Sequence, residues 1–127
     1  MIFNLFSTQM NHLNTMMREA IVQLRMNDPG AIIIVQGDHG PGSQYHGSDI
    51  YQNNFLERAS ILNAVYLPDE EYTDFYDTMT PVNTFRVILN RHFGTQYDLL
   101  PDKTFFSIVS RPYEFVEITF EERAPVE

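Results

Sequence analysis

A strand-sized apolar run at residues 31–35, β-branched at positions 32–35 and followed by Gln36, constrains the fold more than any other feature. Such a run predicts a strand that is buried on both faces, as in a sheet that helices cover on both sides. Before it, residues 7–27 carry apolar side chains at helical spacing, which predicts an amphipathic helix. A helix, a short turn and a buried strand in this order indicate an α/β domain.

Cap and turn residues place the other elements. Ser7 or Thr8 is the expected cap of the first helix, which Asp28-Pro29-Gly30 ends. The density of glycine and proline after the strand marks a loop whose backbone needs unusual angles or close approach. The remaining expected elements are a helical turn at 55–59, a second inner strand at 61–67, an acidic, tyrosine-rich loop at 69–78, a helix that Thr80-Pro81 opens and Gly94 ends, a hairpin of strands 104–109 and 113–120 with the turn Ser110-Arg111-Pro112, and a frayed tail at 121–127.

The chain has 127 residues, the size of one domain or of part of a larger one. Its 17 acidic and 8 basic residues give a net charge of −9, which disfavours nucleic acids and anionic membrane surfaces as partners. The sequence has no cysteine, which excludes disulfides and thiolate metal sites. No apolar run approaches the ~20 residues of a membrane helix. Residues 1–6 lack the regions of a signal peptide and are typical of the interior of a domain.

Asp38-His39-Gly40, directly after the buried strand, is the sharpest chemical feature. Open α/β sheets bind ligands at the carboxyl ends of strands, and aspartate and neutral histidine are good ligands for Zn or Mn. We expect Gly37 and Gly40 to give the turn the backbone freedom that brings both side chains to one ion. The alternative is a structural turn in which Asp38 caps a backbone N–H group and His39 binds nothing.

A second candidate, His46-Gly47, lies in the same loop, where His46 is placed to reach the ion or a bound anion. His12 and His92 lie on expected helices, where exposed or partly packed side chains are the ordinary outcome. The sequence contains no Walker A loop, no dinucleotide fingerprint and no serine triad motif. The sequence therefore indicates metal ligands but no catalytic nucleophile.

Four pieces of the sequence, in order, resemble the C-terminal part of sulfatase-like hydrolases of the alkaline phosphatase superfamily. These pieces are most similar to the membrane-anchored, sulfatase-like proteins that include lipoteichoic acid synthases. The pieces are IIIVQGDHG at 32–40, His46-Gly47, ERASILNAVYLP at 57–68, and MTPVNTF at 79–85 with ILNRHFG at 88–94. The resemblance implies the C-terminal portion of a three-layer αβα sandwich with a mixed sheet. It also implies one incomplete domain over residues 1–127.

The resemblance assigns roles as well. In such enzymes the Asp and His of the DHG motif bind a divalent metal, so Asp38 and His39 are the implied ligands of Mn, Zn or Ca. His46 is then the implied contact to the transferred phosphate or sulfate group. The family's nucleophile and first acidic ligands lie upstream of the motif and have no counterpart in this chain. Ile50 and Tyr51 stand where sulfatases commonly have a lysine.

Three hypotheses follow. The chain is a C-terminal fragment of a metal-dependent sulfatase-like hydrolase or phosphotransferase, inactive alone, whose parent protein is extracytoplasmic and membrane-anchored. Alternatively it is a non-catalytic α/β module, or a subunit that a complementary chain completes. On the fragment hypothesis the partners are the upstream part of the same domain and a phosphate or sulfate ester, and a truncated sheet favours self-association.

Overall fold

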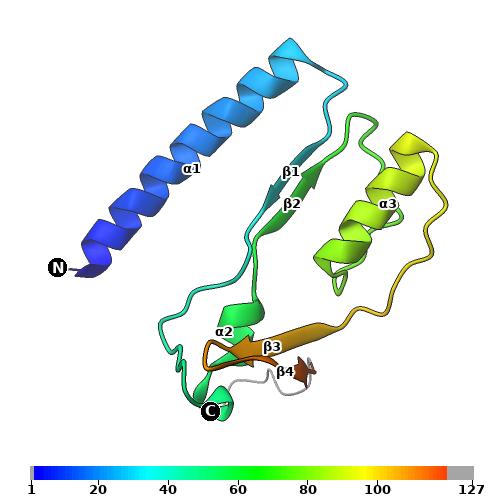
Figure 1. Cartoon of the computed structure of the whole chain (residues 1–127). Helices are drawn as coiled ribbons and strands as arrows, with labels where there is room; N and C mark the ends of the chain where they lie inside the picture. Colours follow the sequence, from blue (N-terminus) through cyan, green and yellow to red (C-terminus); the bar gives the residue numbers. More distant parts are fainter. Residues whose placement is uncertain (1, 120–127) are drawn as a thin grey trace. The chain divides into compact units, whose positions relative to one another are not determined.

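The computed structural model describes residues 2–119 of the chain, with side chains from residue 7 onward. Figure 1 shows the elements in chain order from blue to red. They are α1 (Ile2–Asn27), β1 (Ile33–Gln36), the 3₁₀ helix η1 (Ile50–Gln52), α2 (Phe55–Ala59), β2 (Asn63–Tyr66), α3 (Pro81–Phe93), β3 (Thr104–Ile108) and β4 (Arg111–Ile118). In the described part, β1 pairs with β2 and β3 with β4, in two small antiparallel sheets. The predicted α/β class is confirmed.

The chain divides into two compact units. The first comprises residues 1–34 and 65–71, and the second comprises residues 35–64 and 72–127. The DHG motif, the short helices η1 and α2, the helix α3 and the β3–β4 hairpin all belong to the second unit. The chemistry discussed below therefore lies within one unit.

Helix α1 begins at Ile2, five residues before the predicted start, so the expected cap at Ser7 or Thr8 is wrong. The reason is physical: residues 2–6 contain no helix breaker, and extending a helix by a turn is far easier than starting one. The predicted end is confirmed at Asn27, where Asp28 N–H donates to Leu24 O at 2.8 Å.

Apolar side chains of α1 remain exposed, although their spacing predicts a buried face. Leu13, Met16 and Leu24 are each about half exposed. Near the C-terminal end of the helix, the guanidinium of Arg25 stacks 4.4 Å from the ring centroid of Tyr66. Within the described residues, no helix is both long and apolar enough to cross a membrane.

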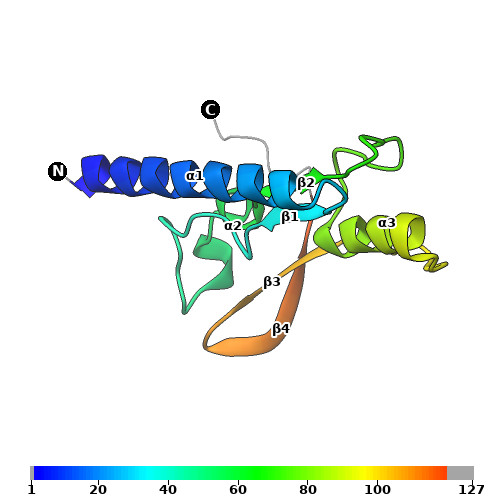
Figure 2. The ribbon, with the colours of Figure 1, turned by 90° about the horizontal axis from the view of Figure 1, so that it is seen from above.

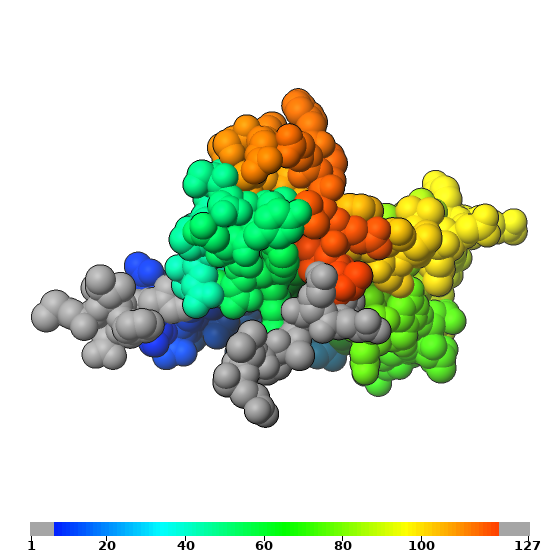
Figure 3. Space-filling model, turned by 90° about the horizontal axis from the view of Figure 1, so that it is seen from below, coloured from blue at the N-terminus to red at the C-terminus, as the bar shows by residue number. Residues whose placement is uncertain are grey.

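The hairpin β3–β4 covers the main apolar cluster of the second unit. Ile50 of η1 packs with Phe106, Ile108 and Ile118 of the hairpin, and Phe55 of α2 meets Phe106 edge to face at 5.1 Å. Figure 2 shows the twist of the hairpin, and Figure 3 shows the segment that contains η1 and α2, in teal and green, against the orange strands. Because side chains alternate between the two faces of each strand, one face of the hairpin is buried against this cluster.

The hairpin turn lies earlier in the sequence than the predicted turn at residues 110–112. Ile108 pairs with Arg111, so the turn consists of residues 109–110, and Arg111 and Pro112 lie inside β4 instead of in the turn. Proline is tolerated there because a strand at the edge of a sheet has backbone positions that face no partner strand. Phe120, the predicted last strand residue, and the predicted tail at 121–127 lie outside the described residues.

Helix α3 has the predicted ends but an unexpected N-terminal contact. Gly94 ends it in the left-handed conformation, with φ of 67°, and Thr80 precedes Pro81 in an extended conformation. The Thr80 side chain makes no capping hydrogen bond to the helix. Its hydroxyl and its backbone N–H instead donate to Oδ1 of Asp102, at 2.6 and 2.7 Å.

Asp102 is the centre of a polar network that ties the segment after α3 to the start of that helix. Buried Asn83 donates to Oδ1 of Asp102 at 3.0 Å and exchanges two further bonds with the Leu100 backbone. Tyr76 donates its hydroxyl proton to Oδ2 at 2.5 Å. Burial by itself raises the pKa of Asp102, but hydrogen bonds from Thr80, Tyr76 and Asn83 outweigh it and lower that pKa. The same bond to Asp102 raises the pKa of Tyr76.

Candidate metal site

The DHG motif starts where the β1–β2 pairing ends. Just beyond β1, Gly37 N–H donates to Leu62 O at 2.9 Å, and Gln36 donates its side-chain amide to Asn63 Oδ1 at 3.1 Å. The chain then bends at Asp38 and His39. The bend places both side chains in solvent-accessible space directly after a strand.

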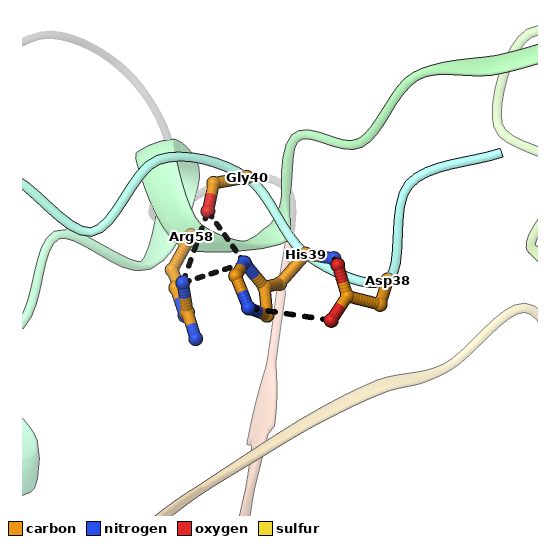
Figure 4. Close-up of polar contacts among 4 residues, drawn as sticks. All are labelled: Asp38, His39, Gly40 and Arg58. Carbon is orange, nitrogen blue, oxygen red and sulfur yellow. Dashed lines mark hydrogen bonds and ion pairs between the residues drawn. The ribbon is translucent and has the colours of Figure 1, made fainter.

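Asp38 and His39 point toward one another (Figure 4). Oδ2 of Asp38 lies 3.4 Å from Nε2 of His39, while Oδ1 of Asp38 accepts the backbone N–H of His39 at 3.0 Å. The Asp38 side chain is 87% exposed and the His39 side chain is 48% exposed. Two adjacent residues thus present an oxygen and a nitrogen to the same point, and neither is packed in an apolar core.

Gly40 is required for close approach, not for an unusual backbone angle. Among the described glycines only Gly94 has a positive φ, so of the two predicted reasons for glycine in this loop, unusual angles or close approach, the structure shows close approach at Gly40. Gly40 is buried, and a Cβ atom there would overlap the carbonyl oxygen of Glu57 and lie 2.5 Å from that of Ser60. The motif therefore packs its glycine directly on the end of α2.

Arg58 joins the site from α2. Its Nη1 lies 2.6 Å from Nδ1 of His39 and 3.1 Å from the carbonyl oxygen of Gly40, while Gly40 N–H donates to Arg58 O at 2.8 Å. The guanidinium also lies 5.6 Å from the ring centroid of Tyr45. Arg58 lies in the segment 57–68, for which the sequence pattern predicted no catalytic or metal-binding role.

The loop between the motif and α2 is fixed to that helix by Ser43. The Ser43 hydroxyl and N–H donate to Oε1 of Glu57, at 2.5 and 3.3 Å. The hydroxyl bond is the main cause that lowers the pKa of Glu57. Asn54 caps α2 by accepting the N–H of Glu57 at 3.0 Å. Ser43 therefore has a structural role, since it connects the loop to α2.

His46 is held through its backbone. Its N–H donates to Oδ1 of Asn53 at 2.8 Å, and its carbonyl accepts from Nδ2 of Asn53 at 3.1 Å. In the part of the chain that the structure describes, no hydrogen bond or ion pair joins the His46 ring to Asp38 or His39. Buried Asn53 also donates to the backbone of Asp49 and Ile50, so it organises this loop, which the sequence pattern did not indicate.

The described residues contain no group of three or more His, Cys, Asp and Glu side chains that could hold a metal ion. The arrangement brings together one oxygen and one nitrogen of the types that bind metals, from Asp38 and His39, with Arg58 and the Gly40 carbonyl on the other side of the imidazole. Comparison with known proteins gave no match to a family model, to a curated protein or to a solved structure.

Proposed function

We propose that this chain is the C-terminal part of a metal-dependent, sulfatase-like hydrolase or phosphotransferase, in which Asp38 and His39 bind the divalent ion. In this proposal the two observed sheets belong to the larger mixed sheet of a three-layer αβα sandwich. His46 contacts the phosphate or sulfate group of the ester. The ordered sequence pieces support the family, and the geometry of the DHG motif supports the metal site.

One distance carries the proposal. Donor atoms bound 2.0–2.2 Å from a tetrahedral ion are separated by about 3.4 Å, because the ligand–metal–ligand angle is close to 109°. Nε2 of His39 and Oδ2 of Asp38 are 3.4 Å apart. The separation of these two donor atoms is therefore the one that a zinc-like ion requires.

The surroundings of His39 also fit a metal ligand. A histidine that binds metal through Nε2 carries its proton on Nδ1, usually donated to a carbonyl or a carboxylate. Nδ1 of His39 lies 2.9 Å from the carbonyl oxygen of Gly40. With a metal ion bound, the same Gly40 that packs on α2 would supply the acceptor that orients the imidazole.

Two ligands leave at least two positions of a tetrahedral ion to other groups. In the proposal these come from the upstream part of the same domain or from a complementary chain, together with the ester. When bound, the ion would polarise the ester as a Lewis acid. We therefore expect this chain to bind metal weakly and to have no hydrolytic activity alone.

Calorimetric titration with Zn²⁺ and Mn²⁺ tests the site. We expect measurable binding that Asp38→Asn and His39→Gln each remove, while the control variants His12→Gln and Asp98→Asn retain it. Asp98 is a suitable control because its side chain is exposed and chemically matched. Binding that survives both site substitutions contradicts the proposal.

A structural turn is the competing interpretation, because the Asp38–His39 backbone bond and the packing of Gly40 hold the loop without an ion. That interpretation predicts no metal effect in any variant and a loss of stability in Asp38→Asn. It corresponds to a non-catalytic α/β module. Circular dichroism of the same variants separates the two cases.

A further inference from the structure

Nδ1 of His39 lies close to two groups, one of which requires a proton on Nδ1 while the other requires that Nδ1 carry none. The carbonyl oxygen of Gly40, at 2.9 Å, can only accept a proton from Nδ1. Nη1 of Arg58, at 2.6 Å, can only donate one, since arginine stays protonated and has no acceptor. A neutral imidazole carries a single proton, so the two contacts require different tautomers of His39.

The Arg58 contact selects the tautomer in the metal-free chain. Two N–H groups that face each other at 2.6 Å repel, so the Nη1–Nδ1 contact is a hydrogen bond only when Nδ1 is bare. The His39 proton then lies on Nε2, between the ring and the Asp38 carboxylate 3.4 Å away. The Gly40 carbonyl remains satisfied, because Nη1 of Arg58 also donates to it at 3.1 Å.

The proton on Nε2 lies where a metal ion would bind. We propose that Arg58 is a positioning residue that holds His39 in the tautomer unable to bind metal, so that metal binding must break the Arg58–His39 bond. This inference rests on the proposed function, since it concerns the same two ligands. Binding moves the His39 proton from Nε2 to Nδ1, where the Gly40 carbonyl accepts it, and Arg58 keeps only its bond to that carbonyl.

The arrangement makes Arg58 a regulator of metal affinity. A charge-assisted hydrogen bond that must be broken, together with a fixed positive charge beside the ligand, weakens binding by about tenfold or more. Removing the guanidinium should therefore tighten binding by that factor. A merely structural arginine predicts the reverse, because its loss would loosen the loop that orients His39.

Nuclear magnetic resonance of the imidazole nitrogens tests the proposal. Two-bond ¹H–¹⁵N spectra distinguish the two neutral tautomers, and single substitutions of the four histidines assign the signals. Spectra of the full chain at about pH 8, well above the pKa of about 6.5 typical of histidine side chains, are recorded without metal and with Zn²⁺. The variants are Arg58→Met and, as a control for the loss of one charge, Arg111→Met in the hairpin.

We expect the Nε2–H tautomer of His39 in the metal-free chain and in Arg111→Met, and the Nδ1–H tautomer in Arg58→Met. Zn²⁺ should bind Arg58→Met about tenfold more tightly than the unaltered chain. An Nδ1–H tautomer in the unaltered, metal-free chain overturns the inference and leaves the proposed metal site intact. This measurement needs no variant, so a misfolded Arg58→Met does not prevent it. A tautomer that follows Arg58 while no protein binds Zn²⁺ overturns the proposed function instead.

Discussion

Replacing Gly40 by alanine is the most direct test of why the DHG motif ends in glycine. The new Cβ would overlap the Glu57 carbonyl oxygen and lie 2.5 Å from the Ser60 carbonyl oxygen, whereas real Cβ contacts stay beyond 3.0 Å. Both obstacles are backbone atoms at the end of α2, so no flexible side chain can move aside. The loop and the helix end must separate.

The size of the effect follows from what this separation breaks. Overpacking at a rigid site costs about 1–3 kcal/mol. The two bonds between Gly40 and Arg58, one from each residue to the other's carbonyl, contribute about 1 kcal/mol each. We therefore expect Gly40→Ala to lower the free energy of unfolding by about 3–5 kcal/mol. That loss is a large part of the stability of a small domain.

Urea unfolding followed by circular dichroism measures this loss. With a slope of about 1–3 kcal/mol per molar, the midpoint should fall by about 1 M or more. Gly47→Ala is the matched control, since its Cβ would meet only the Tyr45 ring edge, at 3.7 Å. Its stability should change by less than about 1 kcal/mol. Equal midpoints for the two variants would refute the close-approach argument.

The remaining predictions concern the Asp102 network, association and activity. Asp102→Ala should cost about 2–4 kcal/mol in thermal or urea unfolding, because buried Asn83 and Thr80 lose their acceptor; an unchanged midpoint contradicts this. The lowered pKa of Asp102 means that its ionised form stabilises the folded chain. This contribution to the free energy of unfolding is present above the unfolded pKa of about 3.9 and is lost as the pH falls through the folded pKa. Stability should therefore fall less steeply with acid in the variant than in the unaltered chain. The raised pKa of Tyr76 affects stability at alkaline pH. Its contribution to the free energy of unfolding is present below the unfolded pKa of about 10 and is lost as the pH rises through the folded pKa. Exposed apolar side chains on α1 and the hairpin predict self-association at micromolar concentration, which a monodisperse monomer in light scattering would contradict. The chain alone should not hydrolyse a phosphodiester or an aryl sulfate with Mn²⁺, Zn²⁺ or Ca²⁺, and metal-dependent turnover that Asp38→Ala abolishes would show that this chain contains the missing catalytic group.

Much of the local structure follows from the sequence. The stop at Asp28-Pro29-Gly30, the short helix at 55–59 and the α3 helix from Pro81 to the residue before Gly94 are found as predicted. These features depend on single residues whose backbone restrictions act locally, such as the fixed φ of proline and the left-handed conformation of glycine. The start of α1 is missed because residues 2–6 carry no signal that separates them from the helix.

The motif itself was visible in the sequence, but its surroundings were not. A strand followed by Asp-His-Gly places a carboxylate and an imidazole at the end of that strand, and this placement can be predicted from these three residues alone. The position of Arg58 against His39 needs residues 19 positions apart to meet, which no local pattern encodes. The Asp102 network likewise joins Thr80, Asn83 and Tyr76 across more than 18 residues.

The sequence by itself determined the α/β class, the position of Asp38 and His39 directly after a strand, and the bounds of the helices at 55–59 and 81–93. These properties reside in residue identity and in short-range backbone geometry. Only the tertiary structure decided between the two predicted reasons for glycine at position 40, in favour of close approach to the carbonyl groups at the end of α2. It also decided the competition between Arg58 and Gly40 for one nitrogen of His39, because hydrogen-bond conflicts exist only between atoms that folding has brought within about 3 Å.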